Sequence, residues 1–245
     1  MNKIAVVFFS LFLMGSAYAE ITPEQTAMLE TAANQITAFY GKNFTVKMVS
    51  PELGKLLSEQ VEKQSAQMGL PIKLNISHFK ISKQGEQQSC QVVLSDATPM
   101  KEALEPQANS MLASTGIGKM LSEASFASMN QAAELLLAGK DSFSLLKESP
   151  TSFDFSADQN LGSFAGLPIS TLKIRISKAN QSLSGFILNM PDQSRLRGTL
   201  QMQKSPDGSM FYPVRMKIDS TLKKTVKGIA LPSVINAVFS EYKFQ

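Results

Sequence analysis

The carboxy-terminal part of the chain alternates apolar and polar residues with a period of two, and this limits the possible folds. Such alternation places every second side chain on one face of a strand. Six runs show it from about Thr151 onward, and the compact turn sequence 204–208 lies between the fourth and fifth. Consecutive strands joined by short turns predict an antiparallel meander. The apolar positions are Phe153 and Phe155; Leu172, Ile174 and Ile176; Phe186, Leu188 and Met190; Leu196, Leu200 and Met202; Tyr212, Val214, Met216 and Ile218; and Val234, Val238, Tyr242 and Phe244.

The two faces of this predicted sheet differ in chemistry. One face is aliphatic, Phe and Met, and therefore has to be covered. The other face is basic, so we expect it to be the outer face of a curved sheet. Its cations are Lys173, Arg175, Arg195, Arg197, Arg215 and Lys217.

The first part of the chain predicts helices with some strand. The segment Thr22 to Gln25 has the pattern of a capping box with proline at the first helical position, and Gly41 ends the helical spacing. Alternation over residues 44–48 predicts a short strand. A second helix is expected from Ser50-Pro51 to near Gly69.

A hairpin and two further helices are expected before residue 151. A three-residue loop centred on Gly85 predicts the pairs Ile76 with Leu94, His78 with Val92 and Lys80 with Cys90. The segment Thr98-Pro99 predicts the start of a helical stretch that Pro106 interrupts. Residues 117–138 predict a strongly helical segment rich in Ala and Ser.

The amino terminus has the features of a secretory signal. Lys3 precedes an apolar run from Ile4 to Met14, and Ala17 and Ala19 place small residues at the two recognition positions. Cleavage is predicted after Ala19. The apolar run is shorter than the roughly 20 residues that span a bilayer. We therefore expect a soluble, periplasmic mature chain without a lipid anchor.

Charge is distributed unevenly along the chain. Residues 20–165 carry 11 Lys and Arg against 16 Asp and Glu, whereas residues 166–245 carry 12 against 4. A basic face of this kind suits an anionic membrane surface or an acidic envelope protein, although the two parts could also neutralise each other within one domain. A nucleic-acid partner is not expected because no basic cluster is interleaved with aromatic residues.

Residues for catalysis or metal binding are scarce. His78 is the only histidine and Cys90 the only cysteine, so neither a zinc site nor an intramolecular disulfide can form. His78 lies in a strand pattern, which disfavours a Ser-His-Asp triad. Cys90 is expected to be a small buried apolar residue, with a reactive or intermolecular thiol as the alternative. We expect no enzymatic activity, no cofactor and no metal.

Three features occur together in the carboxy-terminal third, over about residues 165–245. They are the strands from Leu172, the turn at Asp207-Gly208 before 212–218, and the closing segment 238–244. This combination resembles the LolA/LolB-like family of periplasmic carriers. The resemblance implies an open antiparallel half-barrel whose apolar cavity takes lipid, lipoprotein acyl chains or another amphiphile. The family's amino-terminal strands rich in Phe and Gln are not evident, and residues 98–140 form a longer helical insertion, so no ligand-contacting residue is carried over.

These observations together predict an α+β fold, a curved antiparallel β-sheet (open half-barrel) with helices packed on its concave face. Residues 1–19 are expected to be the signal peptide and 20–245 a single mature domain, helix-rich over 20–150 and sheet over 151–245.

The predicted function is a periplasmic, non-enzymatic carrier or binding protein for a hydrophobic ligand, either a lipid or a lipoprotein acyl chain. The alternative is a cell-envelope interaction protein with a filled core that binds a partner through its basic sheet face or an edge strand. Large adaptable side chains are the candidate cavity-lining residues, although each would equally suit a dry core. They are Phe153, Phe155, Phe186, Met190, Met202 and Met216.

Overall fold

The structure, a computed structural model, describes residues 21–67, 69, 72–114, 133–134, 136–137, 142–158, 161–164, 167–225 and 230–245. Its helices are α1 (Pro23–Tyr40), α2 (Pro51–Gln67) and α3 (Lys101–Ser114). Its strands are β1 (Phe44–Val49), β2 (Ile76–Gln84), β3 (Gln87–Leu94), β4 (Ser144–Glu148), β5 (Ser152–Ala157), β6 (Ser163–Phe164), β7 (Leu167–Pro168), β8 (Thr171–Ser177), β9 (Leu183–Asn189), β10 (Arg195–Lys204), β11 (Phe211–Ser220) and β12 (Val234–Phe244). The predicted signal peptide lies outside the described residues, as does most of the predicted helix over 117–138.

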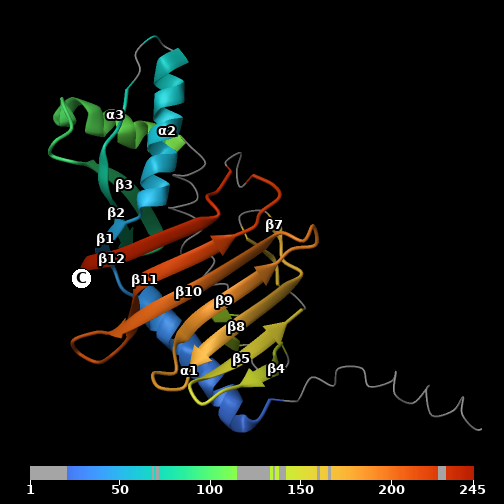
Figure 1. Ribbon diagram of the computed structural model, residues 1–245. Coiled ribbons are helices and arrows are strands. Elements are labelled where there is room, and N and C mark those ends of the chain that lie inside the picture. Colours follow the sequence, from blue (N-terminus) through green and yellow to red (C-terminus); the bar gives the residue numbers. More distant parts are fainter. Residues whose placement is uncertain are drawn as a thin grey trace, which may run out of the picture.

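One antiparallel sheet contains ten of these strands, in the order β3-β2-β1-β12-β11-β10-β9-β8-β5-β4 (Figure 1). Strands β6 and β7 form a separate pair. Because β3 and β4 are edges that do not pair with each other, the sheet is open. The predicted α+β fold with an open antiparallel sheet is confirmed.

The strands predicted from alternation all form, and the sheet extends beyond them at both ends. From β8 to β11 each strand pairs with the next along the chain, as a meander requires. The final strand β12 then pairs with β1, so the amino-terminal strands continue the same sheet. Strand β4, which the sequence analysis did not predict, adds the other edge.

Helix α1 begins with the predicted capping box. The Gln25 backbone N–H donates to Thr22 Oγ1 over 3.3 Å, and the Thr22 N–H donates to Gln25 Oε1 over 2.9 Å. These two bonds satisfy donors that a helix start leaves unpaired. From this start, α1 buries one apolar face. Its apolar members are Met28, Leu29, Ala32, Ala33, Ile36, Phe39 and Tyr40.

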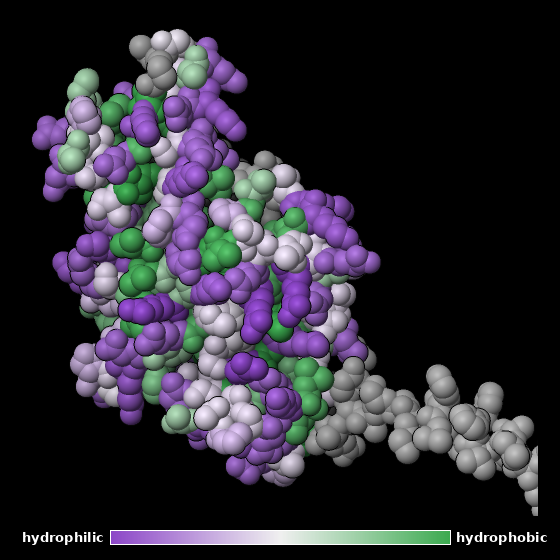
Figure 2. Space-filling model, viewed as in Figure 1, coloured by the Kyte–Doolittle hydropathy of each residue, from purple (hydrophilic) through white to green (hydrophobic). Residues whose placement is uncertain are grey.

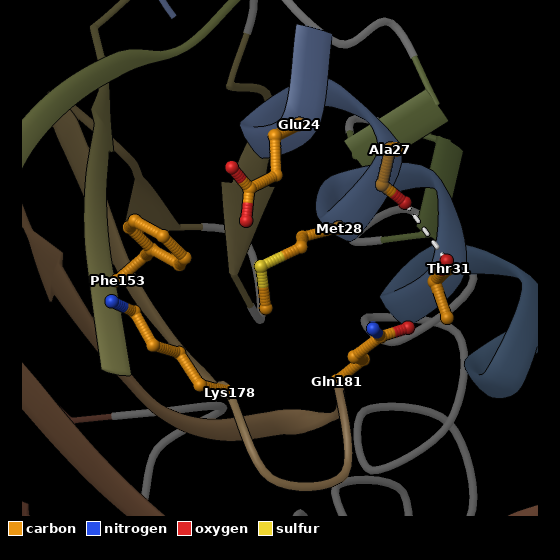
Figure 3. A pocket seen from close by; sticks show the side chains of 7 residues that line it. All are labelled: Glu24, Ala27, Met28, Thr31, Phe153, Lys178 and Gln181. Carbon is orange, nitrogen blue, oxygen red and sulfur yellow. Dashed lines mark hydrogen bonds between the residues drawn. The ribbon is translucent and has the colours of Figure 1, made fainter. Parts of the chain in front are cut away.

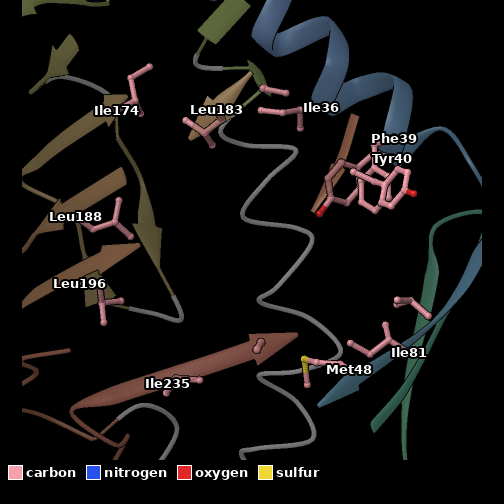
Figure 4. Close-up of a cluster of buried hydrophobic side chains, with 14 of the residues drawn as sticks. Ile36, Phe39, Tyr40, Met48, Ile81, Ile174, Leu183, Leu188, Leu196 and Ile235 are labelled. Carbon is pink, nitrogen blue, oxygen red and sulfur yellow. The ribbon is translucent and has the colours of Figure 1, made fainter. Parts of the chain in front are cut away.

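The main core lies between α1 and the concave face of the sheet. Figure 1 shows α1 crossing behind the strands. Side chains of α1 and of the sheet belong to one buried hydrophobic cluster, part of which Figure 4 shows. At the carboxy-terminal end of α1, Phe39 stacks on Phe44 with ring centroids 4.9 Å apart. Helix α1 contacts only part of the ten-stranded sheet. At its β3 end the sheet is contacted by the other two helices, because α2 packs against β2 and β12 and α3 packs against β3.

The β2–β3 hairpin forms with a tighter turn than predicted. Gln84 pairs with Gln87, leaving a two-residue turn in which Gly85 has φ +58°, the pattern of a type II′ turn. His78 therefore pairs with Val93. The predicted pairs of His78 with Val92 and Lys80 with Cys90 are wrong by one residue, whereas a bulge restores the predicted pair of Ile76 and Leu94.

A second bulge changes the predicted faces of β12. The register against β1 shifts between Thr45 and Lys47, and Glu241 opposite this shift has φ +56°. One extra residue reverses the alternation. Tyr242 and Phe244 therefore contact the core, as predicted, but Val238 is exposed, and Ile235 and Ala237 are buried in its place.

Helix α3 covers the edge strand β3. It starts at Lys101, after Met100 with φ +54°, and continues through Pro106 rather than stopping there. The Asn109 side chain accepts from the Val92 N–H over 2.6 Å and donates to the Val92 carbonyl over 3.0 Å. This amide replaces a neighbouring strand, so the edge is closed to strand addition at this point.

Candidate functional site on the concave face

The concave face has fully buried flanks and a partly exposed centre. Leu188 and Leu196 on one flank and Ile235 on the other are buried. Between them, apolar side chains pack against the core but keep contact with solvent. We call this set the central strip; its members are Phe186, Leu200, Val214, Met216 and Ile218.

Strand pairing makes the central strip continuous. Leu200 pairs with Met216 across β10 and β11, and Gly198 pairs with both Phe186 and Ile218. Directly paired residues of antiparallel strands project their side chains to the same face. The strip therefore crosses three adjacent strands without a polar side chain between its members.

Gly198 allows the Phe186 ring to lie flat on the sheet. A Cβ atom on Gly198 would lie only 2.1 Å from Cε1 of Phe186. Carbon atoms pack at about 3.5–4.0 Å, so any larger residue would displace the ring. The absence of a side chain at Gly198 therefore lets the Phe186 ring lie close to the backbone of β10.

A pocket opens at one end of the concave face, between α1 and the β8–β9 turn. Its volume is about 250 Å³. Met28 and Phe153 are buried and form its apolar surface, while Glu24 and Lys178 supply charge (Figure 3). The remaining lining residues are Ala27, Thr31 and Gln181.

Lys178 is held in place at this pocket by two contacts. Its Nζ lies 4.2 Å from the centroid of the Phe153 ring and 2.5 Å from Glu148 Oε1. In Figure 3 the Glu24 carboxylate points toward the same space from the first turn of α1. An apolar floor beside fixed charges can receive the polar end of an amphiphile.

The structure separates the predicted cavity-lining residues into two groups. Phe155, Phe153 and Met190 are buried, with exposures of 0, 4 and 4%. Phe153 nevertheless lines the pocket under α1. Phe186 and Met216 belong to the central strip, and Met202 is partly exposed farther along β10. All six predicted residues stay candidates for the ligand site.

Three members of the central strip, Leu200, Val214 and Ile218, were not predicted to line the site, although all three were predicted to lie on the apolar face of the sheet. Leu and Ile do not stand out by type as Phe and Met do. The usable signal was Gly198, because a glycine within a strand pattern indicates a close approach of another group.

The two reactive side chains of the sequence lie on opposite faces of the sheet. Cys90 pairs with the buried Ile81, whereas His78 pairs with Val93 one residue out of phase. Burial raises the pKa of the Cys90 thiol to about 12, so the thiol stays protonated at neutral pH. Burial also lowers the pKa of His78. A thiolate activated by histidine cannot form in this arrangement.

The described part of the chain contains neither a cluster of metal-ligating side chains nor a helix that could cross a bilayer. No group of three or more His, Cys, Asp or Glu side chains gathers there. Among the same residues, no helix is both long and apolar enough to cross a bilayer.

Comparison with known proteins finds similarity to solved structures at low sequence identity. No protein-family model and no curated protein matches the sequence. The chain is similar to a LolA superfamily protein from Nitrosomonas europaea, with 11% identity and a TM-score of 0.45 over 90% of this chain and 93% of that one. A domain described as an outer membrane lipoprotein-sorting protein from Vibrio parahaemolyticus shows 11% identity and a TM-score of 0.40, over 88% and 92% of the two chains.

A DUF1329 family protein from Desulfovibrio piger is similar at 8% identity and a TM-score of 0.39, over 90% and 93% of the two chains. The first of these solved structures is described as a LolA superfamily protein, the family that the carboxy-terminal third of this chain resembles in sequence. At these identities the likeness concerns the fold alone.

Proposed function

We propose that the protein is an exported, non-enzymatic carrier that binds a lipid or a lipoprotein acyl chain on the concave face of its sheet. The observation that carries the proposal is the central strip, where Phe186, Leu200 and Met216 meet solvent between fully buried flanks. An apolar face that is left partly open favours a ligand that covers it.

The strip supplies enough apolar contact for useful affinity. Each methylene that leaves water contributes about 0.8 kcal/mol, so about ten methylenes contribute roughly 8 kcal/mol. Association and ordering offset several kcal/mol of this gain. A single acyl chain lying along β9, β10 and β11 would therefore bind measurably but reversibly, as a carrier requires.

Export is the second part of the proposal. Cleavage after Ala19 would leave Glu20 and Ile21 before the Thr22 cap, so the mature chain would begin just ahead of α1. Amino-terminal sequencing of the exported protein should start at Glu20. Material that starts at Met1 would contradict this part without affecting the concave site.

Titration with a fluorescent fatty acid tests the ligand site. Leu200→Trp should fill the strip and Met216→Glu should place a charge in it, so both variants should bind the probe at least tenfold more weakly. Gln201→Glu is the matched control, because Gln201 is exposed on the opposite face of the same strand. It should bind the probe as the native protein does.

Thermal unfolding of the same variants separates ligand binding from folding. Weaker binding at a near-native melting temperature supports the carrier. If the native protein binds no apolar probe, and both strip variants simply unfold, the concave face is dry core and the proposal is wrong.

The second candidate, an envelope interaction protein with a filled core, is favoured by the exposed cations of the outer face. Its edge-strand version is limited by Asn109, which occupies the backbone groups of Val92 on β3. Strand addition would have to use β4 at the other edge. A native protein that binds an envelope partner but no amphiphile would favour this candidate.

A further inference from the structure

The outer face of the sheet carries a concentrated set of cations. Basic side chains project outward from β8, β10 and β11, and on each strand they alternate with residues that face the core. They are Lys173, Arg175, Arg195, Arg197, Arg215 and Lys217, which we call the basic face. Figure 2 shows this side of the molecule, where hydrophilic side chains are interspersed with apolar ones over the sheet.

Most of this positive charge has no partner within the described chain. Arg175 forms a bidentate pair with Asp154, at 2.7 and 2.8 Å, and Lys217 lies 3.0 Å from Asp219. The other four members, Lys173, Arg195, Arg197 and Arg215, form no ion pair with any residue that the structure describes. Two carboxylates therefore stand against six cations.

Register places these cations close enough to act together. Lys173 and Arg197 both pair with Ile187, so only β9 separates them. Lys217 pairs with Thr199, two residues from Arg197 on β10. Neighbouring strands are about 4.8 Å apart and alternate residues about 6.8 Å apart, so the charges lie within one Debye length of one another.

A shallow depression of about 470 Å³ lies within the basic face. Its outward-facing lining consists of hydrogen-bond donors around one exposed apolar residue, Val238, which pairs with Arg215. The donors are Thr199, Gln201, Arg215, Lys217 and Asn236. Two of these donors already have a carboxylate partner, since Asn236 donates to Glu52 over 2.7 Å and Lys217 pairs with Asp219. Thr199, Gln201 and Arg215 have no carboxylate partner among the described residues, so they can receive an anionic oxygen group.

We infer that the basic face docks on a membrane surface of anionic lipids, with a head-group phosphate in the depression beside Arg215 and Lys217. A lipid surface fits better than an acidic protein because the cations spread over three strands, and among the residues that the structure describes no aromatic side chain of these strands lies between them. Protein interfaces concentrate their binding energy on buried aromatic and arginine anchors. The inference goes beyond the proposed carrier and does not depend on it.

Vesicle sedimentation tests this inference with the full mature chain. The protein should bind vesicles of phosphatidylglycerol and phosphatidylcholine but not pure phosphatidylcholine, and binding should weaken as salt rises. Each basic residue near such a surface contributes about 1 kcal/mol, which is about fivefold in affinity. The triple variant Arg195→Gln, Arg197→Gln, Arg215→Gln should therefore bind at least a hundredfold more weakly.

A matched control removes charge from another part of the surface. Lys55→Gln, Lys63→Gln and Lys73→Gln lie in and near α2 and should leave vesicle binding within about threefold. Melting temperatures should stay near native for both triple variants, because the substituted side chains are exposed or form no buried contact.

Three outcomes would overturn the inference. The first is equal binding to neutral and anionic vesicles. The second is an equal loss of vesicle binding in the α2 control variant. The third is binding of inorganic phosphate by a protein that binds no vesicles. Vesicle binding that persists when the Leu200→Trp variant has lost fatty-acid binding would show that docking stands apart from the carrier function.

Discussion

Substitution of Gly198 by alanine should destabilise the protein through one aromatic ring. The new methyl carbon would lie 2.1, 2.3 and 2.8 Å from three ring carbons of Phe186. Relief to a normal contact requires a shift of about 1.5 Å. Overpacking of this kind costs about 1–3 kcal/mol, and loss of glycine flexibility returns about 0.5–1 kcal/mol.

The expected net loss is about 1–2 kcal/mol, which lowers the melting temperature by about 2–8 °C for a domain of this size. Gly54→Ala is the control, because its Cβ would lie 3.7 Å from Ile76 in ordinary contact. Alanine within helix α2 should stabilise the protein by up to about 1 kcal/mol.

A double-mutant cycle with Phe186→Ala identifies the cause. With the ring removed, Gly198→Ala should no longer destabilise the protein, giving a coupling free energy of at least 1 kcal/mol by urea unfolding. The account of the strip would be refuted if Gly198→Ala cost the same in both backgrounds, or cost nothing when Phe186 is present.

Three further predictions concern the edge, the thiol and an ion pair. Asn109→Ala leaves the Val92 N–H and carbonyl unpaired, so it should lower the free energy of unfolding by about 1–3 kcal/mol. It should also increase self-association measured by light scattering, and a variant that stays monomeric would contradict this role. Cys90→Ser should cost about 1–3 kcal/mol and Cys90→Ala less, and native Cys90 should react with a thiol reagent only slowly at neutral pH; fast modification would show a reactive thiol. The Arg175 hydrogen bond lowers the pKa of Asp154, so this pair stabilises the protein above the unfolded pKa near 4. That stability is lost as the pH falls through the lower folded pKa. Asp154→Asn should therefore make the melting temperature less dependent on pH between about pH 5 and 2, and an unchanged pH dependence would count against the pair.

Local sequence signals predicted the elements well because both partners of each signal lie close in the chain. The capping box joins Thr22 and Gln25 within one helical turn. The β12 bulge could not be predicted in this way. It arises where β12 pairs with β1, and its residue Glu241 forms an ion pair with Lys47, 194 positions away.

The candidate site was predicted only in part for a similar reason. Phe and Met residues of the alternating runs were predicted to line the site. This criterion includes Phe186 and Met216 of the central strip, but it also includes Phe155, which has no exposed surface. It passes over Leu200 and Ile218, which follow the same alternation. Exposure depends on which strands α1 covers, and that is set by packing across the whole sheet.

Native mass spectrometry of the protein purified from its own compartment tests the central claim most directly. A carrier should retain an amphiphile through gentle purification, so the native mass should exceed the mass measured after denaturation by that of one lipid or acyl chain. The Leu200→Trp variant should lack the added mass while keeping its melting temperature. Identical native and denatured masses, together with no uptake of added fatty acid, would contradict a ligand site on the concave face.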